Sequence, residues 1–362
     1  HAIEKKKNWF LMTASFALTI MLFFSFSVIL DFAKQLVPSQ NVTSADIALS
    51  SYANKLDIER SLADEIKKID GVANAYGSSY MENIPATSSR AGIDHINIVS
   101  YDDTLLDYSK ESIAQGALDT VYGDSNKVAT VYNRNNSLRI GDTIQFAGEE
   151  VEITCTLSQG LFGDDLIIIC SQETFDRIMG NTKYGLIEIQ LDSNATEETI
   201  AEIRSLENDD IIITDQRESN KQNNATYLAV RIVCYGFLAI VGIISLFNIV
   251  NSISMSVSAR MKQYGAMRAV GMDNRQLKRM ISAEAYTYAI SGLIVGCGIG
   301  LPLSRFLYNR LIAHYFGIEW SFPILWFGIV VAFIFISAIV SVYAPAKRIR
   351  IMAITVTINE WE

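Results

Sequence analysis

The chain contains few of the residues from which enzyme active sites and metal sites are most often built. Its 362 residues include three histidines and four cysteines, and charged residues make up 19%, below the usual quarter of a soluble domain. The histidines, His1, His95 and His314, share no spacing, so material for a zinc site or a histidine-based triad is lacking. There is no phosphate-binding loop ending in Gly-Lys-Ser or Gly-Lys-Thr. The sequence therefore predicts a protein that is not itself an enzyme and has no metal or cofactor of its own.

Apolar residues, in contrast, make up half of the chain, and charge is distributed very unevenly. Residues 31–222 contain 15 basic and 33 acidic residues, a net charge of −18, whereas the remainder contains 15 and 6, a net charge of +9. A polar, acidic block inside an apolar, basic frame is typical of a membrane protein with one large outer domain. No basic stretch with interleaved aromatic residues lies outside the membrane-flanking segments, so we expect no nucleic-acid partner.

Four uncharged runs are each long enough to cross a hydrocarbon core of ~30 Å. They are residues 8–30, 232–259, 285–304 and 320–346. The first lacks a small-residue cleavage site after Asp31, which favours a retained span over a signal peptide. The chain begins with His1 rather than methionine, so we expect it to be processed, tagged or a fragment.

Basic residues cluster at Lys5–Lys7, in the 258–280 connection and at Lys347, Arg348 and Arg350. The positive-inside rule then places both termini and the 258–280 connection in the cytoplasm, and residues 31–222 outside. The predicted order is 1–30 (lead-in and first span), 31–222 (outer domain), 223–257 (second span), 258–280 (inner connection), 281–304 (third span), 305–319 (outer connection), 320–346 (fourth span) and 347–362 (inner tail).

The outer domain is predicted to be α+β. Apolar periodicity indicates two β-α-β units, which could pair into one ferredoxin-like sheet with helices on one face, a porter formed by 43–82 and 184–215. The first unit is a strand at 44–49, a helix at 57–69 and a strand at 72–80; the second is 185–191, 197–206 and 211–214. Between them, 93–182 is predicted to be a small all-β insertion with strands near 93–100, 128–132, 143–146, 150–157 and 166–170. A helical stalk from 215 is predicted to continue into the second span.

Two cysteines of the outer domain form a candidate disulfide. Cys155 and Cys170 flank a predicted turn at 160–165, and a hairpin pairing Gln159 with Leu166 would put them opposite each other. Free thiols are an equal alternative, since only a non-hydrogen-bonded strand pair suits such a bridge.

The 258–280 connection is the candidate functional segment. It holds six basic residues against one acid, Asp273. Met261, Tyr264, Met267 and Val270 recur at helical spacing, which predicts a short amphipathic helix over 258–270. Gly271 is predicted to end it in a left-handed conformation, and Asp273 with Gln276 to cap the next helix. The alternative is a solvated basic loop required only by the positive-inside rule.

One span, a large outer domain, three spans and a basic tail, in this order, resemble the FtsX-like permease family, of the MacB type among ABC transporters. Several segments carry the resemblance: the basic lead-in 2–8, the stretch 251–277 with Arg260, Arg268, Gly271 and Gln276, Glu284 early in the third span, and Pro345-Ala346-Lys347-Arg348-Ile349. Two segments depart from the family pattern: Gln263-Tyr264 replaces an acidic–apolar pair, and 352–358 differs from the usual Asp-Pro-x-Glu-Ala.

The resemblance implies a permease in the bacterial cytoplasmic membrane that pairs with itself or a paralogue. A separate ATPase dimer would bind ATP and Mg²⁺ and drive an outer domain by mechanotransmission. The implied task is export or extraction of a peptide, lipoprotein or antimicrobial, with an outer adaptor or client protein. The residues implied to couple to the ATPase are Arg260, Met261, Tyr264, Met267, Arg268, Val270 and Gly271. Two other functions remain open: an ATPase-driven regulator of a cell-wall hydrolase or sensor kinase, and a membrane-anchored outer enzyme.

Overall fold

The computed structural model describes residues 2–36, 45–52, 55–90, 92–133, 138–161 and 166–351; the side chains of 2–8, 248–249, 252, 261–262, 268–269, 274 and 343–351 lie outside this description. The chain divides into a helical unit, formed by 1–31, 230–308 and 321–362, and an outer unit, formed by 32–229 and 309–320. The outer unit thus takes in the connection that was predicted to lie between the third and fourth spans.

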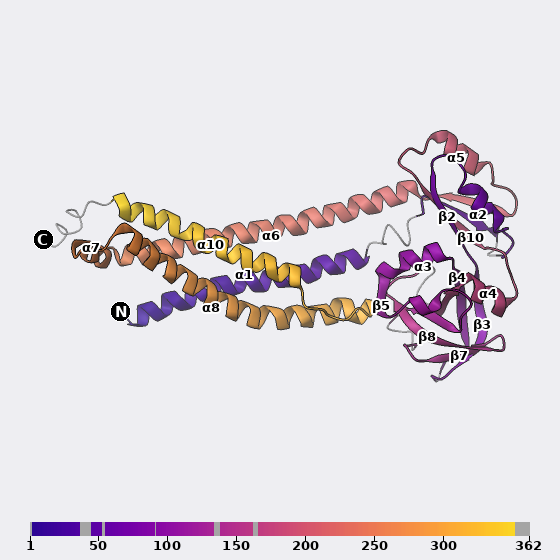
Figure 1. Cartoon of the computed structure of the whole chain (residues 1–362), viewed down its shortest axis with the longest axis horizontal. Coiled ribbons are helices and arrows are strands. Elements are labelled where there is room, and N and C mark those ends of the chain that lie inside the picture. Colours follow the sequence, from indigo (N-terminus) through magenta and orange to yellow (C-terminus); the bar gives the residue numbers. More distant parts are fainter. Residues whose placement is uncertain are drawn as a thin grey trace. The chain divides into compact units, whose positions relative to one another are not determined.

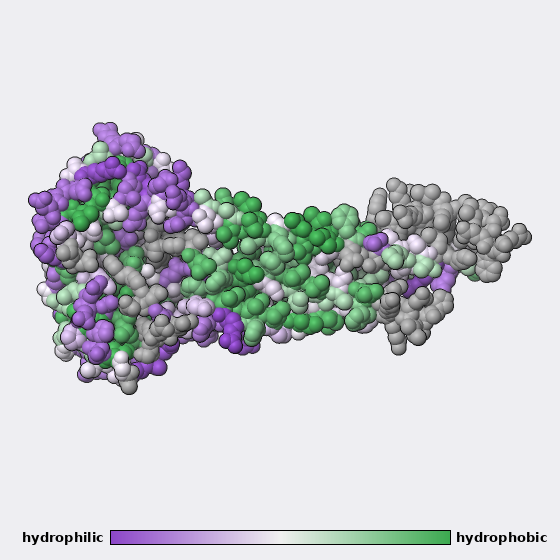
Figure 2. All heavy atoms as spheres, turned by 180° about the vertical axis from the view of Figure 1, so that it is seen from behind, coloured by the Kyte–Doolittle hydropathy of each residue, from purple (hydrophilic) through white to green (hydrophobic). Residues whose placement is uncertain are grey.

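The helical unit is built from the predicted apolar runs. Its helices are α1 (Ala2–Leu36), α6 (Arg217–Ala259), α7 (Met261–Ala269), α8 (Asn274–Tyr308) and α10 (Ile324–Ile351) (Figure 1). Four stretches of the described residues are long and apolar enough to cross a membrane: Trp9–Leu36, Arg217–Phe247, Arg275–Phe316 and Ile324–Val342. α6 is one continuous helix of 43 residues, so the predicted stalk does continue into the second apolar run. On the face shown in Figure 2, apolar side chains gather over the middle of the long helices.

Glycines on α8 allow close packing against α1. A Cβ added at Gly292 would lie 2.3 Å from the Cβ of Phe16, and one at Gly296 would lie 3.0 Å from the Cα of Ala17. Small residues let helix backbones approach where lipid offers no hydrophobic driving force for association. The Thr19 hydroxyl of α1 also donates to the Ser245 hydroxyl of α6, at 2.6 Å. Glycines of the third apolar run therefore form a face that packs closely against α1.

The first sheet of the outer unit contains both predicted β-α-β units. Its strands lie in the order β11-β1-β10-β2, and each neighbouring pair is antiparallel. Apolar side chains of the two helices pack on one face of the sheet. The elements are β1 (Ile47–Ser51), α2 (Ser61–Ile66), β2 (Val72–Ser78), β10 (Leu186–Leu191), α5 (Glu197–Arg204) and β11 (Ile211–Asp215).

α2 is shorter than the predicted helix at 57–69. Ile58 forms an isolated antiparallel bridge with Tyr184, in which each residue's backbone N–H donates to the other's carbonyl at 3.0 and 2.9 Å. A backbone committed to that bridge cannot also begin a helix, so the helix begins at Ser61.

The second sheet has seven strands in the order β5-β8-β6-β9-β4-β3-β7, and β7 also pairs with β8. The predicted insertion is therefore present, but it is not all-β, because α3 and α4 cover its core. The strand that follows β2 also belongs to this sheet rather than to the first. The elements are β3 (Tyr80–Ser88), β4 (His95–Tyr101), α3 (Asp103–Ser109), β5 (Ile113–Gly116), β6 (Lys127–Val131), β7 (Thr143–Phe146), β8 (Glu149–Leu157), β9 (Ile167–Ser171) and α4 (Gln172–Met179).

The pairing of β6 rules out the candidate disulfide. β6 lies between β8 and β9, so Ala129 is the partner of both Cys155 and Ile169. Cys155 and Cys170 are buried in different core clusters, and both are free thiols. The predicted hairpin was wrong because β8 and β9 each pair with a strand from earlier in the chain rather than with each other.

A buried polar layer lies on the face of the first sheet opposite α2 and α5. Glu188 and Tyr76 are register partners on β10 and β2, and both are almost fully buried. The Oε2 atom of Glu188 and the hydroxyls of Tyr76 and Ser78 have no hydrogen-bond partner within the described residues. Burial, with a smaller contribution from Asp102, raises the pKa of Glu188 to about 8. Glu188 therefore keeps its proton to a higher pH than an exposed glutamate does.

The 309–320 connection, which contains η4 (Asn309–Ala313) and α9 (His314–Phe316), packs against the second sheet. The side-chain amide of Gln115 donates to the Gly317 carbonyl at 3.2 Å. Gly317 has a φ of +71°, and a Cβ there would lie 2.4 Å from the ring of Tyr132. Since only glycine suits both the conformation and the contact, this connection is closely fitted to the sheet.

Candidate coupling site

The connection between α6 and α8 folds into the predicted short helix, with a later start. α6 continues to Ala259, so α7 begins at Met261 rather than near Ser258. Gly271 has a φ of +110°, and the backbone N–H of Met272 donates to the Met267 carbonyl at 3.0 Å. This bond and the positive φ form a Schellman motif, which satisfies carbonyls that the helix end would otherwise leave unpaired. The predicted left-handed end at Gly271 is confirmed.

The start of α8 carries a predicted capping interaction. The backbone N–H of Asp273 donates to the side-chain oxygen of Gln276 at 3.1 Å. The backbone N–H of Leu277 donates to the Asp273 carbonyl at 3.1 Å, the first bond of the helix. This is the return half of a capping box, and it fixes α8 directly after the end of α7.

Tyr264 packs inward, against the chain's own helices. Its side chain is only 3% exposed and belongs to a core cluster with Val257 of α6 and with Leu277 and Ile281 of α8. The prediction that Tyr264 shares one partner-facing stripe with Met267 and Val270 was therefore wrong. The spacing identified an apolar residue on a helix, but it does not distinguish an internal core from a partner's groove.

The exposed face of α7 and its C-terminal end shares only Met267 and Val270 with the predicted stripe. Gln263, Ala266, Met267 and Val270 are exposed, and their spacing of three, four and seven residues puts them on one helical face. Met267 is 39% exposed and Val270 is 91% exposed. The predicted coupling side chains of Met261 and Arg268 lie outside the described residues.

A polar cluster ties the start of α7 to α8. An Nη1 of Arg260 donates to Oε2 of Glu284 at 3.0 Å, and the Tyr288 hydroxyl donates to Oε1 of Glu284 at 2.6 Å. The Ser256 hydroxyl of α6 lies 3.5 Å from the same Oε1 atom. Arg260 also hydrogen-bonds Tyr264. Glu284 of α8 therefore pairs with a basic residue of the 258–280 connection, and Arg260, one of the residues implied to couple to the ATPase, is engaged within the chain.

The cluster connects the end of α6 and the start of α7 to the first part of α8. The Arg260 and Glu284 side chains are 24% and 22% exposed, so their attraction is screened less than that of a surface pair. Ser256 and Tyr288 had not been predicted as parts of the site. Tyr288 follows Glu284 by four residues, which places both on one face of α8, and that spacing is the signal that could have found it.

The same stretch carries the family likeness. Residues 235–354 match the family model of the FtsX-like permease C-terminal region. The resemblance to FtsX-like permeases is confirmed. The matched region contains α7, the Schellman motif at Gly271 and the Arg260–Glu284 pair, so the candidate coupling site lies within the FtsX-like segment.

The chain is also a homologue of an ABC transporter permease. It is 23% identical over 228 residues to an uncharacterized ABC transporter permease of Methanocaldococcus jannaschii. The alignment covers 59% of this chain and 56% of that protein. The chain therefore spans about half the length of this curated relative.

Several solved structures are similar to part of the chain. The periplasmic region of MacB from Actinobacillus actinomycetemcomitans is 14% identical, with a TM-score of 0.40, covering 53% of this chain and 98% of that one. The extracellular domain of the noncanonic ABC-type transporter YknZ from Gram-positive bacteria is 13% identical, with a TM-score of 0.36, covering 46% and 98%. A domain of a putative permease from Porphyromonas gingivalis is 12% identical, with a TM-score of 0.34, covering 47% and 90%.

Proposed function

We propose that this chain is the permease subunit of an ABC transporter of the MacB and FtsX mechanotransmission type. In this proposal a separate ATPase dimer binds below α7 and hydrolyses ATP with Mg²⁺, and a second permease copy or paralogue completes the assembly. The FtsX-like segment and the homologous ABC transporter permease support the class. The chain would move an outer domain to export or extract a peptide, lipoprotein or antimicrobial.

The proposed topology has four spans in the bacterial cytoplasmic membrane, with both termini inside. The start of α1, the end of α10 and α7 lie at the same end of the helical unit, which supports one common side for all three (Figure 1). The basic excess in those segments favours the cytoplasm as that side. The outer unit would lie on the opposite side, with the first sheet acting as a ferredoxin-like porter.

The proposed coupling depends on α7 having two different faces. Its inner face is anchored through Tyr264, and Arg260 at its start through Glu284, so α7 cannot shift without displacing the adjoining ends of α6 and α8. Its outer face presents Met267 and Val270, which could seat in a groove of the ATPase in the helix-in-groove manner. A push on α7 would then pass into α6, which continues without interruption to Arg217.

The far end of α6 is tied to the first sheet. Arg217, the first residue of α6, makes an ion pair with Asp215 of β11 at 2.7 Å, and Arg204 of α5 makes a second one at 3.1 Å. These arginines lower the pKa of Asp215 to about 2, so the carboxylate stays charged at physiological pH. Movement of α6 would therefore reach the strand and helix beside it.

The observation that carries the proposal is the exposed apolar pair Met267 and Val270 on an internally anchored helix. We expect Met267→Asp combined with Val270→Asp to lower ATPase copurification at least ~30-fold, because central apolar anchors of an interface cost ~2 kcal/mol or more to lose. The matched control is Ser258→Asp, which adds a charge at an exposed residue of α6 outside this face. Undiminished ATPase binding by the double variant would refute the docking face. Recovery of a cell-wall hydrolase or sensor kinase on the outer domain, in place of a cargo, would assign the regulatory role instead.

A further inference from the structure

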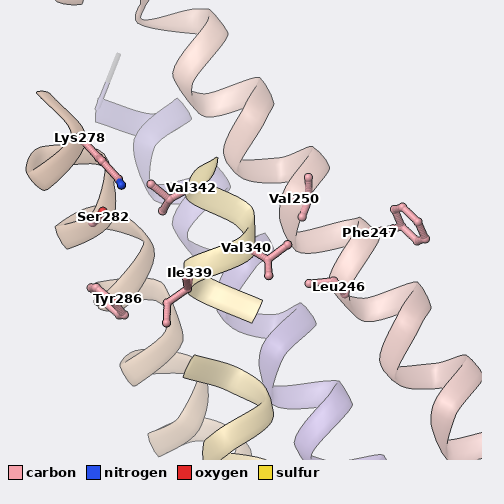
Figure 3. A pocket seen from close by; sticks show the side chains of 9 residues that line it. All are labelled: Leu246, Phe247, Val250, Lys278, Ser282, Tyr286, Ile339, Val340 and Val342. Atoms are coloured by element: carbon pink, nitrogen blue, oxygen red, sulfur yellow. The ribbon is translucent and has the colours of Figure 1, made fainter. Parts of the chain in front are cut away.

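A lateral groove lies between α6, α8 and α10 in the helical unit. Its volume is about 720 Å³, within the range of ~300–1,000 Å³ typical of ligand pockets. The walls are mostly apolar, and the side chains that line the groove come from all three helices (Figure 3). They are Leu246, Phe247, Val250, Lys278, Ser282, Tyr286, Ile339, Val340 and Val342.

The inner end of this groove is strongly basic. A second hollow of about 450 Å³ shares Lys278, Ser282 and Tyr286 with the groove and adds Arg275 and Arg279. The three basic side chains are exposed, and no ion pair is formed by any of them among the side chains that the structure describes. Lys278 extends from α8 toward Val342 of α10 across the groove (Figure 3). A cluster of positive charge therefore lies at one end of the mostly apolar groove.

This arrangement fits one ligand chemistry better than others. An apolar helix from a second copy would fill the groove but would leave the three cations facing a neutral surface. A free phosphate would satisfy the cations but would gain nothing from the apolar walls. A phospholipid with an anionic headgroup matches both parts at once, because basic residues at a membrane surface attract such headgroups and acyl chains bury against apolar side chains.

We propose that the groove binds an anionic phospholipid of the cytoplasmic leaflet. The headgroup phosphate lies at Arg275, Lys278 and Arg279, and an acyl chain runs outward along α6 and α10. The Ser282 and Tyr286 hydroxyls lie between the two parts, in reach of the glycerol oxygens. The inference rests on the proposed membrane insertion and orientation but not on the ATPase partner. The lipid would contact α6, α8 and α10 beside the coupling site, so it would contribute to the packing of these three helices.

The test is native mass spectrometry of the full chain in detergent, titrated with phosphatidylglycerol and with phosphatidylcholine of identical chains. Each basic residue near an anionic headgroup contributes about fivefold in affinity, so Lys278→Gln with Arg279→Gln should weaken phosphatidylglycerol binding roughly 25-fold. Phosphatidylcholine binding should change less than twofold. The matched control, Lys34→Gln with Lys221→Gln, removes the same charge away from the groove and should leave both affinities unchanged.

Two further arms separate the lipid from other occupants. Val340→Trp fills the groove and should weaken the binding of both phospholipids. Glycerol phosphate, which lacks acyl chains, should not displace phosphatidylglycerol at equal concentration. Full displacement by glycerol phosphate would reduce the site to a phosphate site and overturn the proposal. So would unchanged phosphatidylglycerol affinity in the Lys278 and Arg279 double variant. If Val340→Trp disrupts a permease dimer while lipid binding persists, the groove belongs to a second copy.

Discussion

Removing the arginine of the Arg260–Glu284 pair should loosen α7 from α6 and α8. Arg260→Met keeps much of the side-chain length but leaves Glu284 without its cation, with Tyr288 as the remaining close donor. Breaking a fully buried pair costs ~3–5 kcal/mol, and exposed pairs are worth ~1 kcal/mol or less. Since these side chains keep 24% and 22% exposure, we expect a loss of about 1–3 kcal/mol.

Hydrogen exchange is the measurement that reports this loss locally. Protection of an amide reflects the free energy of the opening that exposes it, so a loosened α7 should exchange faster while distant helices do not. At 1.4 kcal/mol per decade, the expected loss is roughly 5- to 150-fold in protection of the α7 amides. The full chain in lipid nanodiscs is compared with Arg260→Met, and the amides of α10 serve as the internal reference.

A double variant tests whether the pair itself is responsible. Arg260→Met combined with Glu284→Met removes both charges and leaves no uncompensated carboxylate, so protection should recover to within about 1 kcal/mol of the native chain. If the two single losses simply add in the double variant, the residues are not coupled, and the inference that this pair holds α7 is refuted. Unchanged protection in Arg260→Met alone would refute it as well.

Two further expectations concern other parts of the molecule. In the folded chain the pKa of Glu188 is raised to about 8 and that of Asp102 to about 6, well above the values of the unfolded chain. Between pH 5 and 8 the unfolded chain loses these protons more readily than the folded chain does, so the free energy of unfolding should fall as pH rises. The slope is at most about 1.4 kcal/mol per pH unit for each group that titrates. Hydrogen exchange of the β2 and β10 amides, corrected for the intrinsic pH dependence of exchange, measures this loss of stability. Glu188→Gln should flatten the dependence of protection on pH. Protection that rises with pH in the native chain would contradict the prediction. Gly296→Leu should force α1 and α8 apart, destabilise the helical unit by about 1–3 kcal/mol and so lower its melting temperature in detergent. Gly298→Leu is the control, because nothing lies within 4 Å of a Cβ at that position, and it should leave the melting temperature unchanged. Equal effects of the two substitutions would contradict the packing of α8 on α1.

The elements that depend on local pattern were predictable from the sequence. The four apolar helices follow from uncharged runs, and the two β-α-β units follow from periodicity at residues such as Ile187 and Ile200. The end of α7 was predictable because Gly271 is the residue type that adopts a left-handed conformation most readily.

Strand pairing in the second sheet was not predictable, because it depends on contacts between distant segments. The alternation in β8 and β9 indicates two strands, but nothing near Cys155 or Cys170 indicates that β6 lies between them. The same limit applies to the candidate site. The spacing of Tyr264 and Met267 predicts a helix with apolar residues, and only the tertiary structure separates the buried tyrosine from the exposed methionine.

The fit of Gly317 against Tyr132 has a practical consequence for anyone who wishes to excise the outer unit. A soluble fragment cut from 32 to 229 would lack 309–320, although those residues belong to the same compact body. The cut would leave the Tyr132 ring and the Gln115 amide without the glycine that they contact, and would expose apolar surface to water. Grafting 309–320 back through a flexible linker would restore that surface, so the natural boundary of this body encloses two separate stretches of the chain.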